Sequence, residues 1–299
     1  MIKTPLVTVV IPSFNHQAYV AQSIRSVLNQ TYKEIELIVI DDGSSDYSVK
    51  IIQKLLRENE FKFIARKNRG LAKTLNEGIK LAKGNYICFL ASDDYFLPRR
   101  IEHAVTRLEH PNNDAIATYT DGFIIDDKNK KVSKFSDIYP RPIVGDTYSN
   151  LIVGNWIPAM GITYKTNILK EFMFDVRFKI EDYTLYLKIF NRNKFKINFY
   201  KSFDFCYRQH GANISNISKV MTYESKLIKK NFPDVKRHAE FIESFKKRSF
   251  SNIFKMNRYD LYLISLKFFR VVLSKMRSMR LIILRHSGLN NFDISLKFK

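Results

Sequence analysis

Two apolar runs in the first hundred residues of this chain each end in a pair of adjacent aspartates. Residues 86–90 are rich in aromatic and branched side chains, which is typical of a buried strand, and Asp93 and Asp94 follow two residues later. An earlier apolar run leads directly into Asp41 and Asp42. In open α/β sheets ligands bind at the carboxyl ends of the strands, so this pattern predicts such a sheet with a ligand site at one edge.

The apolar runs alternate with segments that have the pattern of helices. Strands are expected over residues 6–11, 36–40, 61–65 and 86–90. Helices are expected over 18–28, from the N-cap candidates at 44–46 to about 57, and from about 71 to 83. Strands that alternate with helices of about ten to fifteen residues form βαβ units and a parallel sheet. We therefore expect a Rossmann-like, mostly parallel sheet flanked by helices. Three strand ends then meet at one edge and carry Asn15, Asp41, Asp42, Asp93 and Asp94.

Adjacent carboxylates at a strand end need a chemical explanation. They repel each other, and burying them without a counter-charge is costly. A hard divalent cation relieves both costs, because it takes oxygen ligands and bridges to substrate phosphates. The alternative is a polar turn in which Asp93 or Asp94 caps the helix that follows Pro98. The second acidic pair and the convergence of strand ends favour the cation.

Several short motifs of the chain resemble those of family 2 glycosyltransferases in order and spacing. These are inverting enzymes with a GT-A fold that use nucleotide-sugar donors. The resemblance is strong over about residues 5–110 and continues more weakly to about 210. One departure is Ala91, where many members carry another aspartate. The motifs are residues 9–15 (VVIPSFN), 30–32 (QTY), 36–46 (ELIVIDDGSSD), 68–72 (NRGLA) with Asn76 and Gly78, and 84–94 (GNYICFLASDD).

The resemblance implies a donor site at the acidic edge. Asp94 would be the leading ligand of a divalent Mn²⁺ or Mg²⁺ ion, and Asp93 would bind it directly or through water. Asp42 would accept the imide hydrogen of uracil, whereas Asp41 is a weaker candidate because it can cap or bond its own loop. The other donor-site candidates are Pro12, Phe14 and Asn15 around the base, and Asn68, Arg69 and Gly70 near the phosphates or the sugar, or else at a plain helix start.

Candidates for the acceptor side come from the second half of the chain. A helix is expected from about residue 181 to 191, and Asp182 near its start matches the family's general base. That base deprotonates the acceptor hydroxyl on the face opposite the leaving diphosphate. Its neighbour Glu181 is a weaker candidate, because acids at a helix start also complement the helix dipole. Trp156, the only tryptophan, serves either packing or the floor of the acceptor pocket.

The remaining candidates follow a strand expected over residues 203–207. Arg208 and His210 match a segment that lies near the diphosphate or the metal in some family members. A structural or solvated role is the alternative for His210. Between the two halves of the site, a strand over 115–120 and a hairpin over 121–134 are expected.

Composition bears on the compartment. The chain has 299 residues, 45% of them hydrophobic, which is enough for one large domain or two fused domains. Cys88 and Cys206 fall inside expected strands, which indicates buried free thiols in a reducing compartment. The first strand begins almost at once and no apolar run reaches about 18 residues, so neither a signal segment nor a spanning helix is expected. We expect a cytoplasmic protein.

Positive charge is concentrated towards the C-terminus. Lys and Arg number 50 against 29 Asp and Glu, a net charge of +21, and residues 216–299 hold 19 basic and 6 acidic residues. The clearest helix there spans about 261–284 and is amphipathic, which suits peripheral binding to the anionic inner face of the cytoplasmic membrane. Packing on the catalytic domain is the alternative, and no nucleic-acid motif accompanies the charge. The basic side of this helix holds Lys267, Arg270, Lys275, Arg277 and Arg285.

Together these features predict three regions and one activity. Residues 1–120 would bind the nucleotide sugar, 121–215 the acceptor, and 216–299 would form a basic helical extension. By resemblance, the chain transfers a sugar with inversion from a UDP-sugar to a lipid-linked saccharide of a bacterial capsule, O-antigen or related glycan. One alternative is a nucleotide-binding module without catalysis, consistent with Ala91. The other, a nucleotidyltransferase, would need a glycine-rich phosphate loop that residues 12–15 lack.

Overall fold

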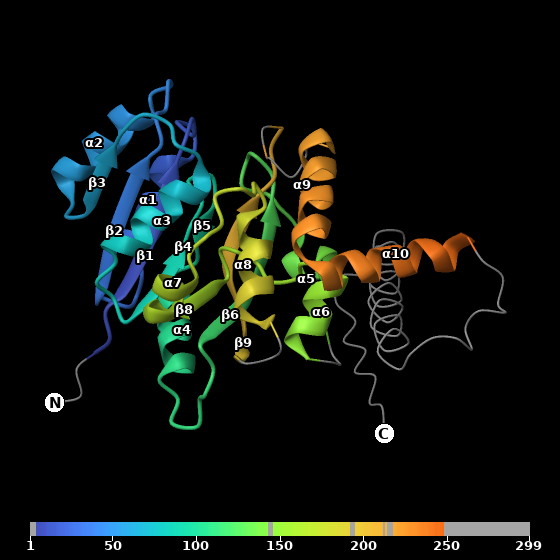
Figure 1. The fold of residues 1–299 in the computed structure, drawn as a ribbon. Coiled ribbons are helices and arrows are strands. Elements are labelled where there is room, and N and C mark those ends of the chain that lie inside the picture. The colour runs from blue at the N-terminus through green and yellow to red at the C-terminus, as the bar shows by residue number, and fades with distance from the viewer. Residues whose placement is uncertain (1–3, 143–145, 192–194, 212, 214–217, 248–299) are drawn as a thin grey trace, which may run out of the picture.

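The computed structural model describes residues 4–142, 146–191, 195–211, 213 and 218–247 (Figure 1). The basic helix expected over about 261–284 lies outside these residues. In the described part of the chain, no helix combines the length and the apolar character needed to cross a membrane. Cys88 and Cys206 are both buried and free, as their positions in apolar runs predict.

The first half of the chain forms the expected βαβ units. β1 pairs in parallel with β2 on one side and with β4 on the other, and β2 pairs in parallel with β3. The expected alternation of strands and helices is therefore confirmed. The elements are β1 (Val7–Ser13), α1 (Val20–Leu28), β2 (Ile35–Asp41), α2 (Ser48–Glu58), β3 (Lys62–Ala65), α3 (Leu71–Leu81) and β4 (Tyr86–Phe89).

The second half extends the same sheet with mixed strand directions. The order of the paired strands is β3-β2-β1-β4-β8-β6-β9-β5, and β7 pairs with β6. β8 runs antiparallel to both β4 and β6, whereas β6 and β9 are parallel. The hairpin expected over 121–134 forms, but its first arm continues the preceding strand, and β5 and β8 are additions. Their bounds are β5 (Tyr95–Phe96), β6 (Ala117–Ile125), β7 (Lys131–Lys134), β8 (Ile162–Lys165) and β9 (Ile197–Arg208).

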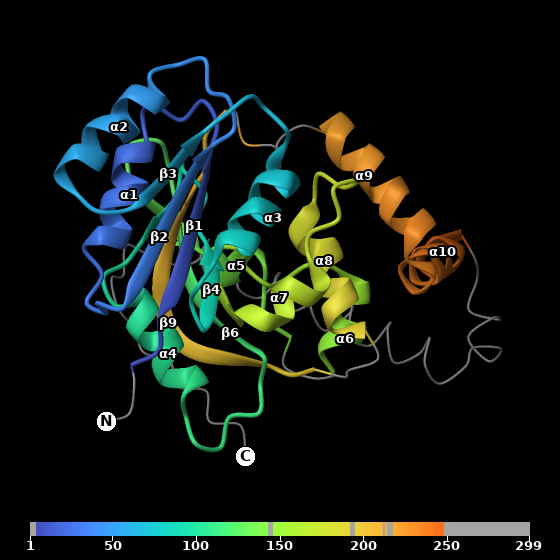
Figure 2. The same cartoon turned by 60° about the vertical axis from the view of Figure 1, so that its left-hand side comes forward.

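Helices cover both faces of the sheet. The alternation of β1 sends Val7, Val9 and Ile11 into a core shared with α1, α2 and α4, and Val10 into a second core with α3, α6, α7 and α8. Figure 2 shows α3, α7 and α8 together on one side, with α9 and α10 outermost. The remaining helices are α4 (Arg100–Leu108), α5 (Phe135–Ile138), α6 (Thr147–Val153), α7 (Thr166–Phe172), α8 (Glu181–Ile189), α9 (Ser218–Asn231) and α10 (Pro233–Lys247).

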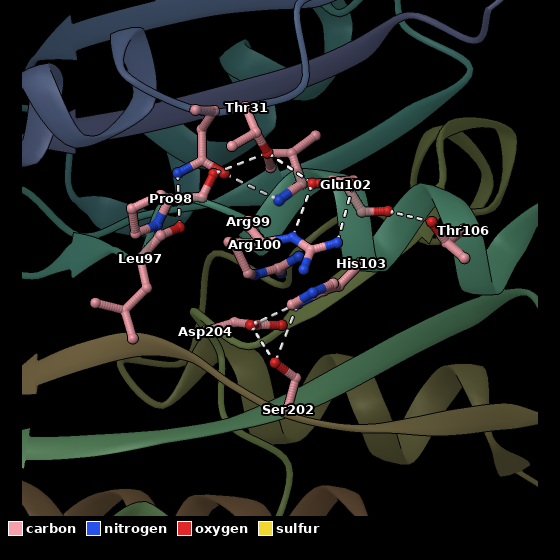
Figure 3. A network of polar contacts seen from close by, with 12 residues as sticks. Thr31, Leu97, Pro98, Arg99, Arg100, Glu102, His103, Thr106, Ser202 and Asp204 are labelled. Carbon is pink, nitrogen blue, oxygen red and sulfur yellow. Dashed lines mark hydrogen bonds and ion pairs between the residues drawn. The ribbon is translucent and has the colours of Figure 1, made fainter.

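A polar network fixes the segment that follows the acidic pair Asp93-Asp94 (Figure 3). His103 on α4 lies 2.8 Å from Oδ1 of buried Asp204 on β9, and the Ser202 hydroxyl donates to the same oxygen at 2.6 Å. The carbonyl of Pro98 accepts a hydrogen bond from the Thr31 amide at 2.9 Å. These contacts hold α4 and the chain before it against the sheet, which gives the acidic edge a rigid support.

Candidate functional site

A cavity of about 1430 Å³ opens at the carboxyl ends of β1, β2 and β4. Residues of α6, α8, α9 and α10 form its far wall. Typical small-molecule pockets occupy roughly 300–1,000 Å³, so this cavity has room for two substrates.

Most of the site residues predicted from sequence line this one cavity. Asp41, Arg69, Arg208 and His210 are not among its lining residues. Arg69 instead lines a smaller cavity of about 320 Å³. The predicted residues that do line the large cavity are Pro12, Phe14, Asn15, Asp42, Asn68, Gly70, Asp93 and Asp94 from the strand edge, and Trp156, Glu181 and Asp182 from the opposite wall.

Asp41 is buried and its carboxylate is occupied by its own loop. Oδ1 accepts hydrogen bonds from the amides of Gly43 and Ser44 at 3.1 and 2.8 Å. Oδ2 accepts from the hydroxyls of Ser13 and Ser44 at 3.0 and 2.6 Å. Gly43 has φ of 82°, and a Cβ there would lie 2.7 Å from the backbone nitrogen of Asn68. Asp41 therefore braces a turn that only glycine fits.

Asp42 holds the loop that precedes α3. Its two carboxylate oxygens accept hydrogen bonds from the amides of Arg69 and Gly70, each at 2.8 Å. The guanidinium of Arg66 forms an ion pair with Asp42 and a second one with Glu77 at 2.8 Å. Because a carboxylate offers about four acceptor positions, Asp42 can still accept a hydrogen bond from a ligand in the cavity.

Asp93 is the centre of a cluster that could hold a metal ion. Its Oδ2 lies 3.0 Å from Nε2 of His210 and 3.8 Å from Nε2 of His16. Ligand atoms of the three residues all lie within 4.8 Å of one another. The Nδ1 of His16 lies 2.8 Å from the Ser92 hydroxyl, which orients the ring. Burial lowers the pKa of His16, so its imidazole is neutral near pH 7, the form that binds metals.

Asp94 and Arg208 lie side by side next to this cluster of three, although Asp94 is not one of its members. Oδ1 of Asp94 accepts a hydrogen bond from the Arg208 amide at 2.7 Å, and its buried Oδ2 has no partner among the described residues. Burial and the charge of Asp93 raise the pKa of Asp94 well above its ordinary value. The buried guanidinium of Arg208 donates to the Asp93 carbonyl at 2.8 Å and to the turn after β6. Arg208 thus ties the acidic pair to that turn.

Asp182, in the first turn of α8, lines the same cavity as the acidic edge. Its Oδ2 accepts a hydrogen bond from Nδ2 of Asn155 at 3.1 Å. Desolvation raises the pKa of Asp182, while the contacts with the Tyr183 amide and Asn155 favour its ionised form. Burial and the charge of Asp182 raise the pKa of Glu181 to about 8. The charge of Asp182 therefore disfavours ionisation of its neighbour Glu181.

Sequence reasoning missed two residues of this site, His16 and Asn155. Both line the cavity. His16 directly follows the motif that ends at Asn15, and Asn155 directly precedes Trp156, so each is adjacent to a residue that was identified. Each was missed because its partner is distant in the sequence. His16 lies near Asp93, and Asn155 bonds to Asp182.

Comparisons with known proteins show which family this chain resembles. Residues 8–195 match the model of Glycosyl transferase family 2. An uncharacterized glycosyltransferase of Rickettsia bellii is 33% identical over 195 residues, which are 62% of this chain and 27% of that protein. The UDP-Glc:alpha-D-GlcNAc-diphosphoundecaprenol beta-1,3-glucosyltransferase WfgD of Escherichia coli is 28% identical over 262 residues, 85% of this chain and 92% of WfgD. The chain spans only 27% to 40% of the length of three Rickettsia relatives.

The fold also matches a solved structure. Staphylococcus aureus TarS 1–349, in complex with UDP-GlcNAc, superposes with a TM-score of 0.60 over 97% of this chain and 95% of that one, at 17% identity. The expected GT-A architecture, a curled and mostly parallel sheet flanked by helices, is confirmed. Since the family model covers more than half of its residues, the chain belongs to glycosyl transferase family 2.

Proposed function

We propose that this protein is an inverting glycosyltransferase that moves a sugar from a UDP-sugar to a lipid-linked saccharide in the synthesis of a bacterial surface polysaccharide. One observation carries the proposal: carboxylates at the strand edge and a carboxylate on the opposite wall share one cavity. Inversion requires a single in-line displacement, so the leaving group and the base must lie on opposite sides of the sugar.

The strand-edge end of the cavity suits a uridine diphosphate. Phe14 is 45% exposed and lines the cavity, so its ring is available to stack on a base. Asp42 would accept the imide hydrogen of uracil. Asn68 and Gly70 line the cavity just before α3, and the N-terminus of that helix, which begins at Leu71, favours phosphate oxygens, whereas the Gly70 amide itself is bonded to Asp42. The UDP-GlcNAc bound to TarS supports a uridine donor.

A divalent cation fits the residues beside this end. The buried Oδ2 of Asp94 lacks a partner among the described residues, and a cation would offset the charge of that carboxylate. Asp93, His16 and His210 offer one oxygen and two nitrogens close together. This donor set suits Mn²⁺ better than Mg²⁺, because imidazole binds transition metals whereas Mg²⁺ prefers oxygen ligands. When bound, the ion would neutralise charge that develops on the departing diphosphate.

Asp182 would act as the general base. Its carboxylate takes the proton of the acceptor hydroxyl while the hydroxyl oxygen forms a bond to C1 of the sugar. The bond from C1 to the diphosphate breaks on the opposite face, and its electron pair leaves with UDP. Asn155 keeps one oxygen of Asp182 oriented during this transfer.

The apolar side of the cavity supports a lipid-linked acceptor. Two lysines there, Lys179 and Lys229, can pair with a diphosphate. The homologue WfgD is named for an acceptor that carries diphosphoundecaprenol. We propose a donor region (1–120), an acceptor region (121–215) and a basic extension (216–299) whose helices α9 and α10 also line the acceptor side of the cavity. The apolar lining includes Ile152, Val153, Trp156, Ile157, Ile228, Val235 and Ala239.

A donor and acceptor screen tests this proposal. UDP and one UDP-sugar at about 100 times their Kd should raise the melting temperature by about 5 °C or more, and GDP and dTDP should not. With Mn²⁺ and a polyprenyl-diphosphate-linked GlcNAc, mass spectrometry should detect one added sugar. Binding of UDP without release of sugar from any donor would contradict the enzymatic function and support the binding module.

We also propose that the basic C-terminal region holds the enzyme at an anionic membrane. Each Lys or Arg near such a surface contributes about 1 kcal/mol. Changing the five basic residues of the 261–284 helix and its end to Gln should abolish sedimentation with anionic vesicles and leave transfer to a water-soluble acceptor intact. Neutral vesicles provide the control. A Gln variant that still sediments with anionic vesicles, or that unfolds, would contradict this assignment. Those residues are Lys267, Arg270, Lys275, Arg277 and Arg285.

A further inference from the structure

We propose that Glu224 of α9 is a positioning residue that holds the first turn of α8 and thereby the orientation of Asp182. The inference rests on the proposed function, because it concerns the proposed base. Glu224 does not line the cavity and its side chain is 1% exposed, so it acts through another element rather than on a substrate.

The contact between the two helices is direct. Oε2 of Glu224 accepts hydrogen bonds from the backbone amides of Lys179 and Ile180, at 2.8 and 3.3 Å. Ile180 is the N-cap of α8 and supplies no side-chain hydrogen bond to the helix. The first amides of a helix need acceptors, and an anion also complements the positive end of the helix dipole. Glu224 therefore satisfies the N-cap amide of α8 and the amide before it, and so holds the chain where it enters the helix.

The position of Asp182 depends on this first turn. Asp182 lies two residues after Ile180. Asn155 holds one of its carboxylate oxygens, and the Tyr183 amide, itself in the first turn of α8, holds the other. A shift of about 1 Å in a reacting group can cost about 10²-fold in rate. Loss of the Glu224 contact should therefore reduce turnover while the donor end, formed by other elements, keeps its affinity.

The carboxylate at this position also carries an electrostatic cost. The charge of Glu224 raises the pKa of Glu181, so the two acids repel each other. α9 also lines the cavity through Met221, Ser225 and Lys229, on the same helix as Glu224. The helix that would contact the acceptor is thus the helix that holds the base, which links acceptor binding to the orientation of Asp182.

A graded series of variants tests the inference. Glu224→Met keeps the side-chain size but removes the acceptor, and kcat should fall about 10- to 100-fold with KM for the UDP-sugar unchanged. Glu224→Gln keeps a weaker, neutral acceptor, and kcat should fall by less than about 10-fold. In both variants, the amides of residues 179–183 should exchange hydrogen faster than in the wild type. Glu240→Ala on α10, an exposed glutamate, is the control and should change neither quantity.

The outcomes separate this inference from the proposed function. Wild-type protein that turns over no donor contradicts the proposed function itself. If the wild type is active, a Met variant with wild-type kcat, or with equal losses in kcat and donor affinity, overturns the positioning role. If the Met variant does not fold, the Gln variant decides. Unchanged kcat together with unchanged amide exchange in that variant also overturns the role.

Discussion

Asp182→Asn is expected to lower sugar transfer by about 10²- to 10⁴-fold, the usual contribution of a general base, while UDP affinity stays unchanged. The amide keeps the shape of the side chain but cannot take the acceptor proton. Single-turnover transfer and calorimetric titration with UDP measure the two quantities separately. Asp114→Asn, on an exposed aspartate paired with Lys196, is the matched control and should behave as the wild type.

The same substitution should not destabilise the fold. The pKa of Asp182 is raised in the folded protein, so ionising this group costs more free energy in the folded state than in the unfolded chain. The free energy of unfolding therefore falls as pH rises from the ordinary pKa to the raised one. Asn removes that cost, and Asp182→Asn should melt at or above the wild-type temperature at pH 7.5. The wild-type transfer rate should fall as pH drops through the raised pKa of Asp182. A variant that melts lower and loses UDP affinity would make Asp182 a structural residue.

Removal of divalent metal is expected to lower transfer by about 10³-fold or more, since a cation at the departing diphosphate contributes several kcal/mol. Mn²⁺ should restore the rate, and Mg²⁺ should restore it less well because of the two imidazoles. Asp93→Asn, His16→Ala and His210→Ala should each weaken Mn²⁺ binding. Electron paramagnetic resonance measures Mn²⁺ binding independently of transfer activity. The fluorescence of Trp156, which lines the cavity, offers a second measure of Mn²⁺ binding.

His110→Ala provides the matched control for the two histidine variants. His110 is exposed and does not line the cavity, so its loss should leave Mn²⁺ affinity unchanged. Full activity in excess chelator would contradict the metal assignment. Unchanged Mn²⁺ affinity in His16→Ala would remove His16 from the ligand set and leave Asp93, Asp94 and His210.

The parallel half of the sheet could be predicted from sequence because its signals are local. β1, β2 and β4 are continuous buried runs, and helices with an apolar face follow β1, β2 and β3. One acidic pair lies at the end of β2 and the other follows β4 after three intervening residues, so the topology alone places Asp42 and Asp93 at one edge. β8 was not predicted, because a strand of only four residues is too short to show a clear alternation of apolar and polar side chains.

The contacts that complete the site could not be predicted in the same way. His210 meets Asp93 across 117 residues, and Glu224 reaches the start of α8 from a helix more than forty residues later. Nothing near Arg208 in sequence indicates that its guanidinium binds the turn after β6. Such pairs depend on how the end of β9 packs against the acidic edge and how α9 packs against the start of α8, which no local sequence period encodes.

The anomeric configuration of the product tests the central claim most directly. We expect a β-linked product when the wild-type enzyme is incubated with Mn²⁺, an α-linked UDP-sugar and a polyprenyl-diphosphate-linked saccharide. The coupling constant of the anomeric proton in the NMR spectrum identifies the linkage. A single displacement with Asp182 on the opposite face of the sugar allows only this inversion. An α-linked product would contradict the arrangement of leaving group and base across one cavity.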